Sequence, residues 1–544
     1  PEIASVDSLH PVIFQSESGD SSLVILSHSA SSAANYTLQL NGTDWLFFKK
    51  MTFEATNTSY GRAVEITGGS HHIQFLNNLF DGVTTTSTSN NLAVVYSPNT
   101  FINHHNAFKN NHFRDGSYGI FFQGNYNGGN FPQGTVVEDN AFENQYFMGL
   151  QLNQQNSPVV RRNLVQSNTA YSNFFGISFY EGNEGGEITF NQVQSSGTGG
   201  YGIAVEYAVG TSSDPVLVAN NFVEMGGVNN SYGIYSEYGE FNQYLFNTVH
   251  VSGENPSSWA FYNYYGTDKI LKNNVLVSTA GGSAMWNYGG FAASDRNDFY
   301  APGSQFAYFD GILQPDLAAW QAATMLDSNS VSVNPQFDTS FHVSAIELNA
   351  AAQPSLLVTL DLDGETRNAT TPDIGADEFT PPANDANLVA FTSPVAPFPA
   401  GSQPVDVILK NNGTATLTSA TIDWQVNAVA QTAVNWTGSL ASSQADTVTL
   451  GNFTFNAGTA YDLLAISSLP NGVADPNPAN DTTSVNDLYA ALAGIYTIGG
   501  ASPDFATFTL AVEALHLRGV SDSVTFNVRN GTYTEPLLRV TVHI

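Results

Sequence analysis

The chain has 544 residues and is 42% apolar, which predicts two to four domains with cores of their own. Its 15 Lys and Arg residues against 47 Asp and Glu residues give a formal net charge of −32, so nucleic acid and anionic membranes are excluded as expected partners. The absence of cysteine excludes disulfides and cysteine-ligated metals. No apolar run reaches the ~18–20 residues that a membrane span requires.

An Asn followed by apolar residues recurs from about Phe75 to Tyr300, at spacings of 23 to 33 residues. Such a loose period predicts stacked coils whose loops vary in length. In a stack, an Asn can form hydrogen bonds with its copies in the coils above and below. The recurring residues are Asn78, Asn111, Asn140, Asn163, Asn191, Asn221, Asn247, Asn274 and Asn297.

Most of these turns carry a second motif, in which Gly or Ala precedes an apolar residue, as in Tyr201-Gly-Ile and Tyr232-Gly-Ile. The residues after it alternate with period two, which predicts a strand. The first and third residues past the Gly are expected to point inward, and the second and fourth outward. A β-sandwich with irregular loops is the alternative, although a sandwich does not need Asn and Gly columns in register.

The Asn and Gly-Ile columns resemble a right-handed parallel β-helix of the pectate-lyase-like superfamily. Residues 361–367 and 372–379 are similar to the closing motif of such β-helices in secreted proteins of Bacteroidota. We therefore expect an all-β fold in which residues 1–382 form a right-handed parallel β-helix solenoid of about 14 coils. Its N-terminal cap is expected to be missing.

A Pro-rich break at residues 380–385 is followed by about 100 residues of short alternating strands separated by turn clusters, which predicts an Ig-like β-sandwich over residues 383–487. Residues 410–414, Trp424 and residues 475–481 resemble the adhesion-type Ig-like modules of bacterial surface proteins. That resemblance implies a spacer or adhesive role rather than catalysis.

Residues 488–544 are expected to form the helical N-terminal cap and first strands of a further β-helix. Ser502 is the predicted N-cap with Pro503 at the first helical position, and Gly519 ends the predicted helix. The last strand-like run and the first residues of the chain read as consecutive coils. The chain thus resembles a repeat unit of the giant secreted surface or filament proteins of Bacteroidota.

One outward face of the predicted coils is rich in aromatic and acidic residues. Tyr and Trp rings can stack on sugars, and Glu206 and Glu237 on adjacent coils are close for an inverting hydrolase pair. No Lys or Arg falls among these positions, which argues against a lyase. We favour a lateral contact with another copy over a glycan face. The predicted face comprises Tyr180, Glu206, Tyr207, Tyr235, Glu237, Tyr238, Tyr262, Tyr264, Tyr265, Trp286 and Tyr288.

Two further groups could bind a metal. The acidic residues near the closing motif are interpreted first as structural and, as the alternative, as a Ca²⁺ site. The adjacent pairs His71-His72 and His104-His105 are expected to point to opposite sides of a strand, so neither pair should share one metal. The acidic candidates are Asp361, Asp363, Glu365, Asp373 and Asp377.

Together these patterns predict a non-enzymatic structural and adhesive repeat unit of a large extracellular filament or cell-surface adhesin. Its expected partners are other copies of itself and, secondarily, glycans of a cell, prey or host surface. No cofactor is expected, with Ca²⁺ as the alternative. A polysaccharide-binding or polysaccharide-degrading β-helix protein is the competing function.

Overall fold

The computed structural model describes residues 6–125, 131–182, 185–338 and 342–535. They fall into two compact units, Pro1–Phe379 and Thr380–Ile544. Within the described residues the regular secondary structure is almost entirely strands, with two α-helices, which confirms the all-β class. The predicted continuity between the end and the start of the chain rests on residues 536–544 and 1–5, which lie outside the described residues.

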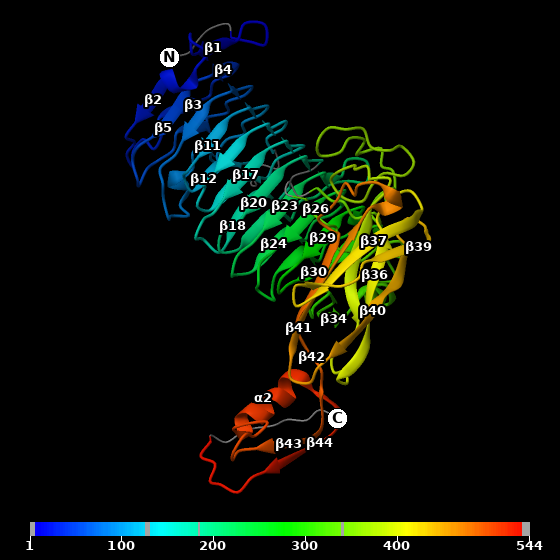
Figure 1. Cartoon of the computed structure of the whole chain (residues 1–544). Coiled ribbons are helices and arrows are strands. Elements are labelled where there is room, and N and C mark those ends of the chain that lie inside the picture. Colours follow the sequence, from blue (N-terminus) through cyan, green and yellow to red (C-terminus); the bar gives the residue numbers. More distant parts are fainter. Residues whose placement is uncertain (1–5, 126–130, 183–184, 339–341, 536–544) are drawn as a thin grey trace. The chain divides into compact units, whose positions relative to one another are not determined.

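The first unit is a parallel β-solenoid built from three long sheets, whose strands follow one another in turn along the chain (Figure 1). The first sheet consists of β1 (Val12–Gln15), β4 (Leu46–Lys49), β7 (Gln74–Leu76), β10 (Ala107–Lys109), β13 (Val136–Glu138), β16 (Val159–Arg161), β19 (Glu187–Thr189), β22 (Val216–Ala219), β25 (Asn242–Leu245), β28 (Ile270–Lys272) and β31 (Ala293–Asp295). The second sheet consists of β2 (Ile25–His28), β5 (Thr52–Ala55), β8 (Leu79–Asp81), β11 (His112–Arg114), β14 (Ala141–Glu143), β17 (Leu164–Ser167), β20 (Gln192–Ser195), β23 (Phe222–Met225), β26 (Thr248–Val251), β29 (Val275–Ser278) and β32 (Asp298–Tyr300).

The third sheet carries the face that the sequence singled out. It consists of β3 (Leu38–Asn41), β6 (Val64–Thr67), β9 (Val95–Ser97), β12 (Tyr118–Gln123), β15 (Met148–Asn153), β18 (Phe174–Tyr180), β21 (Gly200–Glu206), β24 (Ser231–Glu237), β27 (Trp259–Tyr264), β30 (Ser283–Tyr288), β33 (Ala307–Phe309) and β34 (Ile312–Gln314). All neighbours except β33 and β34 are parallel.

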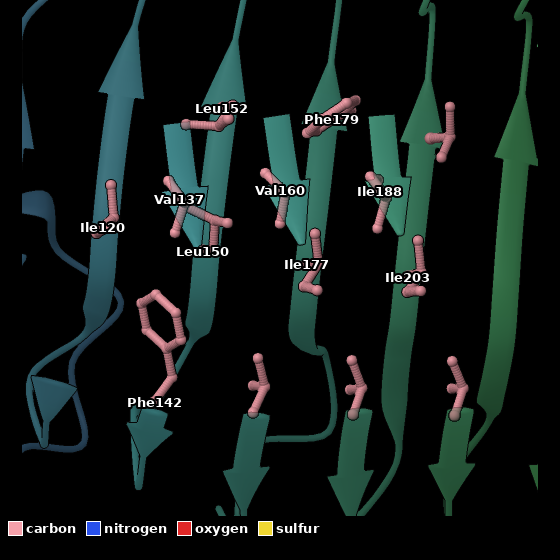
Figure 2. Close-up of a cluster of buried hydrophobic side chains, with 14 of the residues drawn as sticks. Ile120, Val137, Phe142, Leu150, Leu152, Val160, Ile177, Phe179, Ile188 and Ile203 are labelled. Atoms are coloured by element: carbon pink, nitrogen blue, oxygen red, sulfur yellow. The ribbon is translucent and has the colours of Figure 1, made fainter. Parts of the chain in front are cut away.

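The core of the solenoid is formed by the predicted inward positions. Ile120, Leu150, Ile177 and Ile203 share one register position on successive coils, and none is exposed to solvent. In Figure 2 these side chains point into the same interior as Val160 from the first sheet. Equivalent residues stack from coil to coil, so each new coil buries the apolar face of the coil before it.

The recurring Asn residues form one continuous buried ladder, as the sequence predicted. From Asn78 to Asn297, the Nδ2 of each Asn donates to the Oδ1 of the next at 2.9–3.1 Å. Asn297 ends the series by donating to Oδ1 of Asp327. Each amide thereby satisfies polar groups in a corner that is closed to water.

The solenoid has eleven coils in the described residues, so the prediction of about 14 was wrong. The chain stops coiling after β33, where β34 turns back antiparallel. An unpredicted helix, α1 (Leu317–Thr324), then places Trp320 in the solenoid core, where its Nε1 donates to Oδ2 of Asp327 at 2.8 Å. These residues form the end of the solenoid rather than further coils.

Residues 342–379, here called the strap, run over the outside of the coils. Leu348, Val358 and Ile374 of the strap pack against Leu245 and Val275 of the coils. The guanidinium of the strap residue Arg367 lies 4.1 Å from the ring of Phe246, and its Nη2 donates to Oδ1 of Asn220 at 2.7 Å. The predicted closing motif therefore anchors the chain to the side of the solenoid.

The second unit contains two antiparallel sheets around one core, to which Val407, Trp424 and Leu463 contribute. One sheet is formed by β35 (Ala386–Ser393), β36 (Gly401–Asn411) and β40 (Ala445–Phe455). The other contains β37 (Leu417–Val426), β38 (Val429–Ala430), β39 (Val434–Leu440), β41 (Ala460–Ser468) and β42 (Thr482–Tyr489).

The unit ends with β43 (Leu492–Ile498), α2 (Phe508–Arg518) and β44 (Val520–Val528), and the two strands pair in parallel. Gly519 caps the helix at its C-terminus as predicted. The N-cap is Thr507, whose hydroxyl accepts from the N–H of Leu510, and not Ser502. Ser502 has a positive φ of 48°, whereas an N-cap residue is normally extended, which explains why its cap-like sequence does not start the helix.

Candidate functional site

The predicted aromatic and acidic residues gather on the outer face of the third sheet. The strand pairing places Tyr235, Tyr262 and Trp286 in one column, in register across adjacent coils. Glu206, Glu237, Tyr264 and Tyr288 form a second column beside it. Tyr180 pairs with Glu206 in the second column, and Tyr207, Tyr238 and Tyr265 follow at the corner beyond these strands. We call these eleven residues the Tyr/Glu face.

The rings of the Tyr/Glu face stack on one another along the solenoid. Ring centroids of Tyr207 and Tyr238 are 5.1 Å apart with planes 18° from parallel, and those of Tyr238 and Tyr265 are 5.4 Å apart. Tyr235, Tyr262 and Trp286 stack in the same way. The π faces are therefore largely occupied by neighbouring rings. Tyr207, Tyr238 and Tyr265 remain 40%, 40% and 38% exposed.

Glu206 and Glu237 lie directly opposite each other on β21 and β24. Burial and, to a smaller extent, the charge of Glu237 raise the pKa of Glu206 to about 7. Glu237 accepts a hydrogen bond from the hydroxyl of Tyr235 at 2.8 Å. The pair thus combines a carboxyl group, Glu206, that binds its proton more tightly than usual with a second carboxyl group that accepts a hydrogen bond from a tyrosine.

A buried lysine lies behind this pair and was missed by the sequence analysis. Nζ of Lys269 donates to Oδ1 of Asn263 at 2.8 Å and to the backbone oxygen of Tyr265 at 2.6 Å, and the residue is fully buried. Burial lowers the pKa of Lys269 to about 7, against the opposing effect of the charge of Glu237. Lys269 comes a few residues after the outward-facing positions of the repeat, and its side chain is buried. A search of the outward-facing positions alone therefore does not find it.

The Tyr/Glu face can make hydrogen bonds through tyrosine hydroxyls and carboxyl groups, but it offers few free ring faces for stacking on a sugar. An inverting hydrolase needs a separation of about 6.5–9.5 Å between the carboxyl groups to admit a water, whereas neighbouring strands lie about 4.8 Å apart.

The histidine pairs do not behave as predicted. His71, His72, His104 and His105 all line one open groove with Trp45, so the expectation that adjacent histidines face opposite sides was wrong. The reason is local: His72 and His105 adopt positive φ angles of 57° and 54°, which break the alternation of a strand.

The acidic candidates near the closing motif separate into two groups. Asp361 accepts the backbone N–H groups of Glu365 and Glu378, and Asp373 accepts those of Ala350 and Phe379. These two carboxylates therefore hold the strap's backbone, while Glu365 is exposed.

Asp363 and Asp377 instead converge on His342, a residue that the sequence analysis did not select. The sequence does not predict that these three residues meet, because they are 14 to 35 residues apart and follow no repeat.

Residues 100–299 match a family model described as a right handed beta helix region. The solenoid is a right-handed parallel β-helix. The matched part of this β-helix contains the whole Tyr/Glu face. A comparison with curated proteins found no match.

Several solved structures resemble parts of the chain at low identity. The CARDB domain of the PF1109 protein from Pyrococcus furiosus, in complex with di-metal ions, is 23% identical with a TM-score of 0.17, and the match covers 20% of this chain and 96% of that one. The periplasmic alginate epimerase AlgG is 15% identical with a TM-score of 0.37, covering 55% and 74%. PfbA, a surface adhesin of Streptococcus pneumoniae, is 13% identical with a TM-score of 0.30, covering 50% and 62%. These scores are too low to transfer a ligand or an activity.

Proposed function

We propose that this chain is a non-enzymatic structural and adhesive unit of an extracellular filament or cell-surface protein, and that its Tyr/Glu face binds other copies. The observation that carries the proposal is the stacking of the tyrosines on one another. Because the ring faces are covered, the face presents ring edges and hydroxyl groups in regular columns, and a second β-helix presents the same columns at the same spacing of about 4.8 Å. Tyrosine suits such contacts, since it combines apolar area with a hydroxyl.

The rest of the chain fits this role. In the β-helix, the backbone groups of each coil form hydrogen bonds with the neighbouring coils. These parallel rows of hydrogen bonds would resist a pulling force on the filament. The two-sheet region, which the sequence predicts to be an Ig-like module, would act as a spacer. Neither α-helix of the described chain has the length and apolarity of a membrane span. The resemblance to giant secreted surface or filament proteins of Bacteroidota is part of this proposal.

Self-association is tested by sedimentation velocity over a range of concentrations. The triple variant Tyr207→Ser, Tyr238→Ser, Tyr265→Ser removes the three exposed rings while leaving the buried core intact. We expect wild-type chains to associate and the triple variant to sediment as a monomer. Leu356→Ser, which removes a side chain that is 98% exposed on the strap, serves as the control and should associate like the wild type. Equal association of the triple variant would contradict the proposal.

The competing function is polysaccharide binding or degradation, and the Glu206/Glu237 pair is the observation that favours it. A carboxyl that holds its proton near pH 7 beside a carboxylate is the combination that glycoside hydrolysis uses. Glycan-array binding and loss of depolymerisation in both Glu206→Gln and Glu237→Gln would establish this function. Under our proposal neither activity is found in the wild-type chain.

A further inference from the structure

We propose that His342, Asp363 and Asp377 form a binding site for one divalent transition-metal ion of the zinc type. One ligand atom from each of the three residues lies within 4.8 Å of the other two. Nε2 of His342 is 3.3 Å from Oδ2 of Asp363. Two ligands at about 2.0–2.2 Å from a tetrahedral zinc ion are themselves about 3.3–3.6 Å apart, so this pair already has the required spacing.

A further carboxylate lies on the far side of the His342 ring from the proposed site. Nδ1 of His342 lies 3.6 Å from Oδ2 of Asp338, so a carboxylate faces one ring nitrogen while the other faces the site. The backbone N–H of His342 also donates to Oδ1 of Asp338 at 3.0 Å. A carboxylate behind a ligating histidine fixes the ring and increases the basicity of the nitrogen that binds the metal.

A small cavity of about 30 Å³ adjoins two of the three residues. His342 and Asp377 line it together with Thr248, Gln192 and Gln194 of the coils, whereas Asp363 does not. That volume holds about one water molecule, and the polar lining supplies partners for it. Zinc sites with three protein ligands commonly take a water as the fourth. The cavity therefore provides a fourth position that the side chains leave open.

The ligand types decide which ion fits. Calcium and magnesium take oxygen ligands almost exclusively, and calcium needs six to eight of them. An imidazole nitrogen with two carboxylates favours zinc or another late first-row ion. The surrounding charge also favours a cation, because Asp361 lies near Asp377 and adds a further carboxylate.

The site has a structural consequence for the strap. His342 lies at the start of the strap, Asp363 in its middle and Asp377 near its end, so one ion would tie three separate parts of an irregular segment together. A metal that binds the folded strap and not the unfolded one stabilises the folded form by mass action. The ion would thus fasten the strap to itself at the place where it covers the coils.

The test is titration of the full chain with ZnCl₂ by calorimetry after treatment with EDTA, combined with hydrogen exchange of the strap. We expect one zinc per chain, slower exchange in residues 342–379, and at least a tenfold loss of affinity in His342→Ala and in Asp363→Asn. Because Asp363 is exposed, its variant should fold even if the histidine variant does not.

His112→Ala provides the matched control. His112 is another partly exposed histidine paired with a carboxylate, Glu143, at 2.9 Å, but among the residues that the structure describes it belongs to no group of three potential metal ligands, and its variant should bind zinc like the wild type. Absence of zinc binding would overturn the proposal. Undiminished binding in Asp363→Asn, or equally tight binding of Ca²⁺, would also overturn it.

Discussion

The buried Asn ladder and the exposed Tyr/Glu face are built by the same repeat, yet they have opposite energetic consequences. In the ladder, an amide has a donor and an acceptor, so identical side chains on adjacent coils complement each other. On the Tyr/Glu face, the same stacking places Glu206 against Glu237, and identical charges repel. Repetition therefore stabilises a coil stack when the repeated group is self-complementary. Two carboxylates at the same position of adjacent coils, such as Glu206 and Glu237, reduce the stability of the stack. Their presence therefore indicates a role other than folding.

The largest effect is expected from breaking the ladder at its centre. Asn191 accepts from the backbone N–H and Nδ2 of Asn163, and donates to the oxygens of Val160 and Asn221. In Asn191→Ala these buried partners lose their hydrogen bonds, so we expect a loss of about 3–5 kcal/mol in the free energy of unfolding of the β-helix. Urea denaturation measures the loss.

Asn168→Ala is the control for that variant. Asn168 is exposed and accepts a hydrogen bond from the hydroxyl of Ser196, so its removal should cost less than about 0.5 kcal/mol. Similar losses in the two variants would mean that the ladder contributes no more than a surface contact.

A smaller effect of opposite sign is expected on the Tyr/Glu face. The pKa of Glu206 is raised to about 7 by burial, so the folded protein binds a proton more tightly than the unfolded chain does. Stability from this group is present at acidic pH and is lost as the pH rises from about 4.5 through 7. Glu206→Gln removes the charge, and we expect it to increase stability by about 2 kcal/mol at pH 8.

The same variant should leave stability unchanged at pH 4, where the wild-type carboxyl is already protonated. Denaturation at both pH values checks this difference. Glu240→Gln, at an exposed position of the same β-helix, is the control and should show little change. A Glu206→Gln variant that is no more stable than the wild type at pH 8 would show that ionisation of Glu206 does not oppose folding.

The smallest effect is expected from protonation of the histidines that line the groove with Trp45. The backbone N–H of His104 donates to Nδ1 of His71 at 2.9 Å, and that of Gln133 donates to Nδ1 of His104 at 3.1 Å. Protonation of either Nδ1 would remove an acceptor. Burial lowers the pKa of His104 below its ordinary value, and the nearby histidines lower it further. The stability contribution is therefore present above pH 6.5 and is lost as the pH falls.

We expect this effect to cost roughly 1 kcal/mol between pH 7 and pH 5, because the groove is open to solvent. Thermal unfolding of wild type and His104→Gln over that range measures it. The variant should show a shallower loss of stability on acidification. Identical pH profiles would show that proton uptake by His104 does not oppose folding.

The sequence predicted those features that repeat in every coil. The Asn column and the inward Ile and Leu positions follow from a pattern that each coil satisfies locally, and the structure confirms both. The misses are features that occur once. Three such features are the end of the coils at β33, Lys269 behind the Tyr/Glu face, and His342 beside Asp377. Each depends on contacts between residues that are not related by the repeat, so the periodicity of the sequence does not predict it. The histidine pairs were misplaced because positive φ angles at the corners interrupt the alternation of a strand.

The most direct test of the central claim uses the absence of cysteine from the chain. In each of the single variants Tyr207→Cys, Tyr238→Cys and Tyr265→Cys, the introduced thiol is the one site at which a disulfide can form. If copies associate through the Tyr/Glu face, at least one variant forms a linked dimer rapidly under mild oxidation, whereas Asn168→Cys, at the position that follows β17, does not. Equal and slow dimerisation of all four variants would contradict the proposed interface.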